Sequence, residues 1–192
     1  MLKIAYSPIY AHPLPANHRF PMAKYELLPQ QLLYEGMITE ENIFTPKPVS
    51  EKYILNTHCS DYWDKLRNLQ LTRKEERRTG FPLSPELILR EITIAQGTIE
   101  AALFALQYGI AMNIAGGTHH AFTNRGEGFC LLNDLAIASN YLLEKRLVRQ
   151  ILIVDLDVHQ GNGTAQIFQN QPKVFTFSMH GAKNYPLHKE TS

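Results

Sequence analysis

The segment that most constrains the fold is the apolar run Ile151-Leu152-Ile153-Val154, which leads directly into Asp155-Leu156-Asp157-Val158-His159. A short apolar run bounded by polar residues is typical of a strand buried on both faces of a parallel sheet. Side chains alternate along a strand, so residues 155, 157 and 159 are expected to point the same way. A divalent cation would relieve the repulsion between the two carboxylates, and the alternative is a solvated turn whose aspartates cap the next helix.

The elements around this strand alternate between helix and strand. Helical spacing of apolar residues begins after Ser84 and Pro85 and ends at Gly109, and Asn133 is a candidate cap for a second helix. The predicted strands are 1–6, 110–115, 151–154 and 174–178, the predicted helices are 84–109 and 134–145, and 72–80 is predicted to be a solvated loop. This alternation indicates an α/β fold, in which ligands bind beyond the carboxyl ends of parallel strands.

Composition excludes several classes of protein. The chain has 192 residues, 44% of them hydrophobic, which suits one domain over residues 1–192, and its formal net charge of +1 favours neither nucleic acid nor a membrane surface. Its two cysteines, Cys59 and Cys130, are too few for a disulfide framework and indicate reduced thiols. No run approaches the ~18 apolar residues of a membrane span, so a cytoplasmic protein is expected.

A second polar cluster, Gly116-Gly117-Thr118-His119-His120, follows the predicted strand at 110–115. Imidazole titrates near neutral pH, so adjacent histidines beside a predicted ligand site are candidates for proton transfer. The alternative is that one of them is a buried, hydrogen-bonded core residue.

Three segments together resemble the successive signatures of the zinc-dependent histone deacetylases, in order and in spacing: 116–121, 128–134 and 155–163. Weaker matches lie at 17–21 and 58–62, so the resemblance covers nearly the whole chain. Gln160 and Asn162, where most members carry His and Asp, resemble the small class IV branch. The resemblance implies an arginase/deacetylase-like, three-layer α/β/α fold with a mainly parallel sheet.

The resemblance also implies a role for individual residues. Asp157 and His159 match two of the three zinc ligands, and His119 and His120 match the tandem histidines that transfer protons. Asp155 matches the carboxylate that hydrogen-bonds the first histidine, and with Ser178 it matches ligands of an inner monovalent-cation site for K⁺.

Three further positions concern the second histidine and the substrate. Asn162 replaces a carboxylate behind His120, and a neutral partner is expected to lower the basicity of that histidine. Gly128 and Phe129 match one wall of the narrow tunnel that holds an acyl-lysine side chain, although Phe129 could also be an ordinary core residue. Cys130 is expected to pack beneath the site, because zinc already activates water.

The implied function is zinc-dependent hydrolysis of the amide bond of acetyl-lysine, in a protein or in a related small N-acylated amine. Family members carry a third zinc ligand and an oxyanion-stabilising tyrosine on later segments, and neither motif occurs in residues 164–192. The chain is therefore expected to be the amino-terminal part of a longer domain, incompletely active in this form. The alternatives are a non-catalytic acyl-lysine-binding or assembly module and a ureohydrolase-like binuclear manganese enzyme; the spacing around His159 disfavours the latter.

Overall fold

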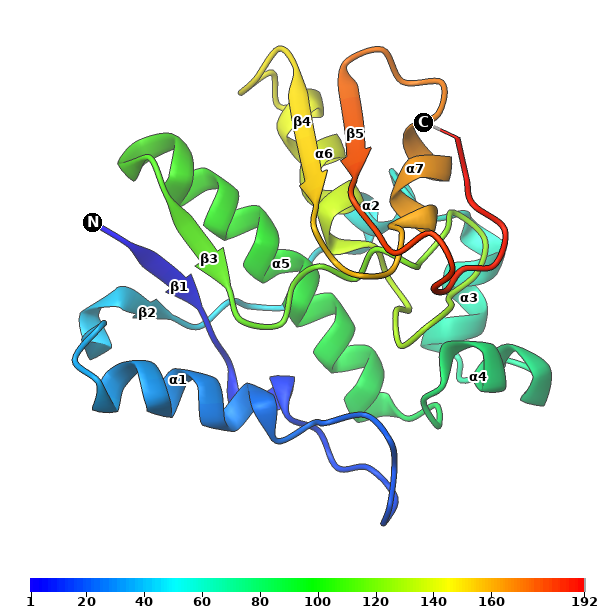
Figure 1. The fold of residues 1–192 in the computed structure, drawn as a ribbon, viewed down its shortest axis with the longest axis horizontal. Coiled ribbons are helices and arrows are strands. Elements are labelled where there is room, and N and C mark those ends of the chain that lie inside the picture. The colour runs from blue at the N-terminus through cyan, green and yellow to red at the C-terminus, as the bar shows by residue number, and fades with distance from the viewer. Residues whose placement is uncertain (192) are drawn as a thin grey trace.

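The computed structural model describes residues 1–191, in which strands and helices alternate along most of the chain (Figure 1). The strands are β1 (Lys3–Ala5), β2 (Ile43–Phe44), β3 (Ala111–Asn113), β4 (Ile151–Asp155) and β5 (Val174–Ser178). The helices are α1 (Lys24–Tyr34), α2 (Glu51–Leu55), α3 (Ser60–Arg67), α4 (Arg73–Thr79), α5 (Pro85–Tyr108), α6 (Asp134–Glu144) and α7 (Asn162–Phe168), with short 3-10 helices η1 (Pro8–Tyr10) and η2 (Glu40–Asn42).

All the strand pairs among the described residues are parallel, and they form two sheets. The first sheet has the order β2-β1-β3, with Ile4 opposite both Ile43 and Met112. The second consists of β4 and β5, with Asp155 opposite Ser178 at its carboxyl end. The predicted α/β fold with a parallel sheet is confirmed.

The long helix α5 leads into β3 and packs on β1 and β3 of the first sheet, and its ends follow the expected signals. The Ser84 hydroxyl accepts a hydrogen bond from the Leu87 N–H at 3.2 Å, Pro85 lies in the first turn, and Gly109 ends the helix with φ of 87°. Helix α6 packs along α5, and its cap Asn133 accepts from the Ala136 N–H at 3.0 Å. A core of aliphatic and aromatic side chains fills the space between these helices and α3.

The segment 72–80 is a helix, so the prediction of a loop is wrong. Thr72 and Glu75 form a reciprocal capping box: the Glu75 carboxylate accepts from the Thr72 N–H at 2.7 Å, and the Thr72 hydroxyl accepts from the Glu75 N–H at 3.3 Å. Gly80 closes α4 in a left-handed conformation, with φ of 82°. The helix has no apolar periodicity, so its sequence signal lies in the two caps alone.

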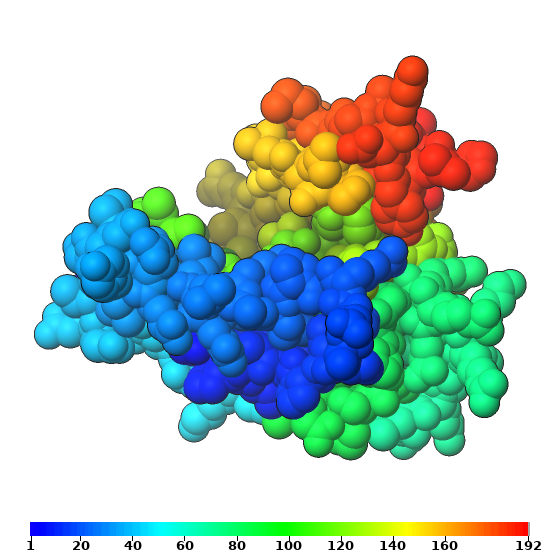
Figure 2. Space-filling view, turned by 60° about the horizontal axis from the view of Figure 1, so that its bottom comes forward, coloured from blue at the N-terminus to red at the C-terminus, as the bar shows by residue number. Residues whose placement is uncertain are grey.

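Strand β4 is buried on one face only, so the prediction of burial on both faces is wrong. Ile153 is 8% exposed and packs with α6 and α7, whereas Leu152 and Val154 are 61% and 53% exposed. Phe175 and Phe177 of β5 are 65% and 47% exposed, and nothing in residues 1–191 covers this face. Figure 2 shows β4, β5 and the carboxyl-terminal segment (yellow to red) rising above the blue amino-terminal segment. Within the described residues, no helix combines the length and apolar character required to cross a membrane.

Candidate active site

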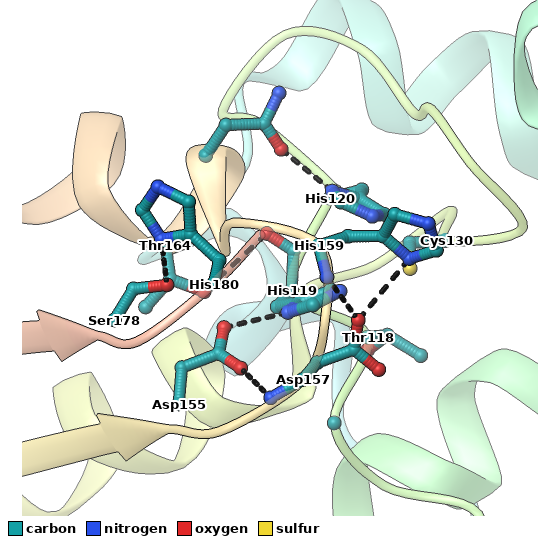
Figure 3. Close-up of polar contacts among 12 residues, drawn as sticks. Thr118, His119, His120, Cys130, Asp155, Asp157, His159, Thr164, Ser178 and His180 are labelled. Carbon is teal, nitrogen blue, oxygen red and sulfur yellow. Dashed lines mark hydrogen bonds and ion pairs between the residues drawn. The ribbon is translucent and has the colours of Figure 1, made fainter. Parts of the chain in front are cut away.

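The polar residues singled out above gather where β4 and β5 end and where the loop after β3 meets α6 (Figure 3). Asp134, the first residue of α6, is 1% exposed, and its carboxylate accepts from the N–H groups of Gly117 and Thr118 at 3.1 and 2.7 Å. These bonds fix the backbone just before His119 and His120. The amino-terminal end of α6 therefore positions both histidines.

His119 is bound to the end of β4. Its Nδ1 donates to Asp155 Oδ2 at 2.6 Å, and the two side chains are 9% and 12% exposed. Burial alone would raise the pKa of Asp155, but the hydrogen bond from His119 counteracts burial, and the pKa lies below its ordinary value. Gly161 makes room for this pair, since a Cβ there would lie 2.2 Å from Asp155 Oδ2. The Nε2 atom of His119 is left as the acceptor.

His120 forms a second pair of the same type. Its Nδ1 donates to Asn162 Oδ1 at 2.7 Å, so its Nε2 also carries a lone pair. Burial, together with the neighbouring His119 and His159, lowers the pKa of His120 to about 4. Gly128, with φ of 52°, lies against the imidazole, and a Cβ at this position would be 2.7 Å from His120 Cδ2. His120 is therefore neutral near pH 7, and only glycine fits beside it.

Asp157 and His159 lie together, but not on an extended strand. Strand β4 ends at Asp155, and residues 156–159 bend so that Asp157 turns to His159 while Asp155 turns to His119. The expectation that residues 155, 157 and 159 alternate along one extended strand is therefore wrong, and the Asp157 and His159 side chains are 50% and 44% exposed. Their Oδ1 and Nδ1 atoms are 3.1 Å apart.

That separation fits two ligands of one zinc ion. Tetrahedral zinc with bonds of roughly 2.0–2.1 Å places neighbouring ligand atoms about 3.3 Å apart. Within residues 1–191 no third His, Cys, Asp or Glu completes a metal-binding group with them. The described residues therefore fit two of the three protein ligands that catalytic zinc sites use.

Asp155 and Ser178 are also brought together. They are register partners across β4 and β5, and both line a cavity of about 170 Å³ with Gln160 and Thr164. His180 lines the same cavity, with its Nδ1 2.9 Å from Ser178 Oγ. Oxygen atoms from two strands thus surround a small enclosed space.

A larger cavity of about 410 Å³ opens beside the histidines. Its lining consists of Arg19, Phe20, Pro21, Arg78, His120, Gly128, Phe129, His159 and Tyr185. The rings of Phe20 and Phe129 are 5.0 Å apart, and the ring of Tyr185 is 5.0 Å from that of His120. The cavity therefore combines aromatic walls with the imidazoles of His120 and His159.

Helix α4 holds the Phe129 wall in place. The N–H groups of Gly128 and Phe129 donate to the carbonyls of Arg78 and Thr79 at 3.1 and 2.7 Å. Phe129 itself has φ of 66°, a conformation uncommon outside glycine and often found at functional positions. Phe129 thus lies on the same cavity as His120.

Sequence reasoning missed Tyr185, Arg19, Phe20 and Arg78. The weak match at 17–21 was a usable signal for Arg19 and Phe20, but no pattern marked Tyr185. Cys130 is buried, and burial raises the pKa of its thiol, which suits the expected packing position rather than a nucleophile.

The histone deacetylase domain model matches residues 18–192, nearly the whole chain. The chain belongs to the histone deacetylase family. Among its relatives in this family, an uncharacterized protein of Picosynechococcus is 48% identical over 189 residues, which are 98% of this chain and 63% of the relative. Histone deacetylase 2 of Arabidopsis thaliana is 27% identical over 176 residues, covering 88% of this chain and 46% of the relative.

Solved structures of histone deacetylase homologues agree with this assignment and with the α/β fold. A homologue in complex with SAHA superposes with a TM-score of 0.83 at 26% identity, covering 98% of this chain and 54% of that chain. A homologue from Aquifex aeolicus gives a TM-score of 0.78 at 25% identity, covering 96% and 53%. The chain thus spans about half to two thirds of the length of these family members.

Proposed function

We propose that this chain carries the proton-transfer residues and two metal ligands of a zinc-dependent deacetylase, which hydrolyses acetyl-lysine or a related N-acylated amine. The observation that carries the proposal is the grouping of two oriented imidazoles, His119 and His120, beside the Asp157–His159 pair. The names of the relatives support the class of reaction, since they include a histone deacetylase and a homologue bound to SAHA.

Asp157 and His159 would hold the zinc ion through Oδ1 and Nδ1, the two atoms that lie 3.1 Å apart. When bound, zinc polarises the amide carbonyl of the substrate and lowers the pKa of water. The half-exposed position of both side chains leaves the metal side of the site accessible from the 410 Å³ cavity.

The histidines would move the protons. His120 is neutral near pH 7, and its Nε2 is free to take a proton from the attacking water, while Asn162 fixes the tautomer at Nδ1. The same proton then goes to the departing amine nitrogen as the C–N bond breaks, and the second proton of the water follows it, so that water and amide give a carboxylate and an ammonium group. Asp155 orients His119 beside it, and the ring centroids of the two histidines are 4.1 Å apart.

Gly128 and Phe129 would hold the substrate. The missing side chain of Gly128 leaves room next to His120, and the Phe129 ring forms an apolar wall for a linear alkyl chain. Asp155 and Ser178 would bind a monovalent cation such as K⁺ in the 170 Å³ cavity behind the site. A cation there would stabilise the negative charge that Asp155 presents to His119.

One observation favours the second candidate function, a non-catalytic acyl-lysine-binding module. The 410 Å³ cavity and its Phe20 and Phe129 rings are formed within the described residues and need no metal ion to be in place. A module of this kind would keep the cavity and bind the acyl chain without turnover.

The test measures zinc-dependent acetate release from an acetyl-lysine peptide by the protein at its natural length. Release should rise with added zinc and fall by roughly 10²–10⁴-fold in His120→Ala. Asp157→Asn should weaken zinc binding, measured by competition with a chromogenic chelator, whereas Asp61→Asn, an exposed carboxylate on α3, should not. If the peptide binds but no acetate is released at any zinc concentration, the non-catalytic binding module becomes the better explanation.

A further inference from the structure

Two guanidinium groups lie on the same cavity as the candidate catalytic histidine His120. Arg19 comes from the segment before α1 and Arg78 from the last turn of α4, and both line the 410 Å³ cavity together with Phe129. Both arginines are exposed, so they lie where the cavity opens to solvent. Nothing in the proposed chemistry uses either of them.

Arg19 is held at this position by its neighbours. Its guanidinium carbon lies 4.9 Å from the centre of the Phe129 ring, a cation–π contact on the cavity wall. The adjacent His18 donates through Nε2 to the Gly80 carbonyl at 2.8 Å and accepts at Nδ1 from the Phe20 N–H at 3.2 Å. This segment is thereby attached to the end of α4, so Arg19 and Arg78 are placed by the same element.

The acidic residues of α4 do not neutralise Arg78. Glu75 pairs with Lys65 at 2.8 Å and also caps the helix through Thr72. Glu76 accepts from the Leu83 N–H at 3.2 Å. Both carboxylates therefore bind other groups on α4 or on neighbouring segments, and neither pairs with Arg78.

The acidic residues near the histidines also interact with groups other than Arg19 and Arg78. Glu127 accepts from Arg125 Nε and from the Tyr185 hydroxyl, both at 2.8 Å, and Asp157 lies against His159. Within the described part of the chain, neither Arg19 nor Arg78 has an ion pair or a side-chain hydrogen bond. The cavity entrance therefore carries two cations whose charge no protein carboxylate compensates.

We propose that Arg19 and Arg78 select the substrate: the cavity takes acyl-lysines whose neighbouring residues are Asp or Glu and disfavours those flanked by Lys or Arg. This inference rests on the proposed acyl-lysine site. A guanidinium binds a carboxylate through paired hydrogen bonds, and it repels a lysine or arginine brought to the same rim. Arg19 lies against the Phe129 ring, so a flanking carboxylate would meet Arg19 while the alkyl chain passes the aromatic wall.

The test compares two fluorescent peptides of equal length that both carry the methyl-ketone isostere of acetyl-lysine, which is not hydrolysed. One peptide has Glu on both sides of the isostere and the other has Lys. Fluorescence anisotropy should show about tenfold tighter binding of the Glu peptide at about 50 mM salt, because two exposed ion pairs act together, and a much smaller difference at about 0.5 M salt.

Charge-reversed variants assign the selectivity to the two arginines. Arg19→Glu/Arg78→Glu should reverse the preference, whereas Arg149→Glu should leave it unchanged. Arg149 is an exposed arginine just before β4, at the opposite end of that strand from the site. Thermal unfolding tests whether the Arg19→Glu/Arg78→Glu variant folds. If this variant does not fold, Arg19→Gln/Arg78→Gln is used in its place, and it should abolish the preference for the Glu peptide without reversing it.

Equal affinity for the two peptides, or an unchanged preference in the double variant, would overturn the selectivity proposal. Because the probes are not hydrolysed, these affinities do not depend on whether the protein turns the substrate over. A preference for the Glu peptide without acetate release would refute the proposed deacetylase activity but support the proposed selectivity. Acetate release without any preference would support the deacetylase activity and refute the selectivity.

Discussion

Gly80→Ala should disturb the cavity wall from outside the cavity. Gly80 ends α4 with φ of 82°, and a Cβ built on it lies 2.7 Å from Cε1 of Phe129. The substitution therefore has two separable effects: it strains the backbone in the left-handed region, and it pushes the Phe129 ring.

The size of each effect follows from the geometry. An alanine in the left-handed conformation costs about 1–2 kcal/mol of unfolding free energy. Ordinary contact begins at 3.4 Å, so the Phe129 ring has to move by about 0.7 Å while its N–H stays bound to the Thr79 carbonyl. Displacements of this order near a reacting group cost roughly tenfold or more in ligand affinity or rate.

Gly109→Ala is the matched control. Gly109 ends α5 with φ of 87°, and nothing lies within 4 Å of a Cβ at that position. Urea unfolding, followed by the fluorescence of the single, buried Trp63, should show a similar loss of about 1–2 kcal/mol for both variants. Only Gly80→Ala should weaken binding of a methyl-ketone acetyl-lysine peptide, by about tenfold.

Equal affinities in the two variants would refute the reasoning, because they would show that α4 does not determine where Phe129 lies. A Gly80→Ala variant as stable as the wild type would separately refute the claim that the left-handed conformation at this position strains an alanine.

Three further predictions concern titration and ion binding. Asn162→Asp should raise the basicity of His120, whose pKa is lowered to about 4, and so shift the acidic limb of the pH–rate profile to higher pH; an unshifted profile would dismiss the role of the neutral partner. Burial lowers the pKa of His58 from 6.5 to about 4, so its stabilising contribution is present above pH 6.5 and is lost as the pH falls toward 4. Urea unfolding across that range should show a loss of up to about 3 kcal/mol that shrinks in His58→Gln, and an equal loss in the variant would exclude His58 as the cause. Replacing NaCl by KCl should raise the melting temperature of the wild type but not of Ser178→Ala; equal shifts would argue against a cation at Asp155 and Ser178.

The family signatures and the alternation of elements were accessible from the sequence because their determinants are local. The ends of α5 and α6 are set by Ser84, Gly109 and Asn133, whose side chains or backbone act within one helical turn. The end of β4 follows from the change of an apolar run to Asp155. Helix α4 was also encoded locally, by the Thr72–Glu75 capping box and Gly80, and was missed because its charged sequence lacks an apolar period.

Other features depend on contacts between distant segments, which no local pattern records. Tyr185 lies 5.0 Å from His120 because the segment after β5 returns across the site, and Arg19 lies over Phe129 because His18 binds the end of α4. The same holds for burial: alternation along β4 separates Ile153 from Val154, but only the packing of α6 and α7 decides which face is covered. The sequence by itself determined which residues are candidates for the chemistry and in which order they occur. The tertiary structure decided which of them share a cavity, because that depends on packing between segments far apart in the chain.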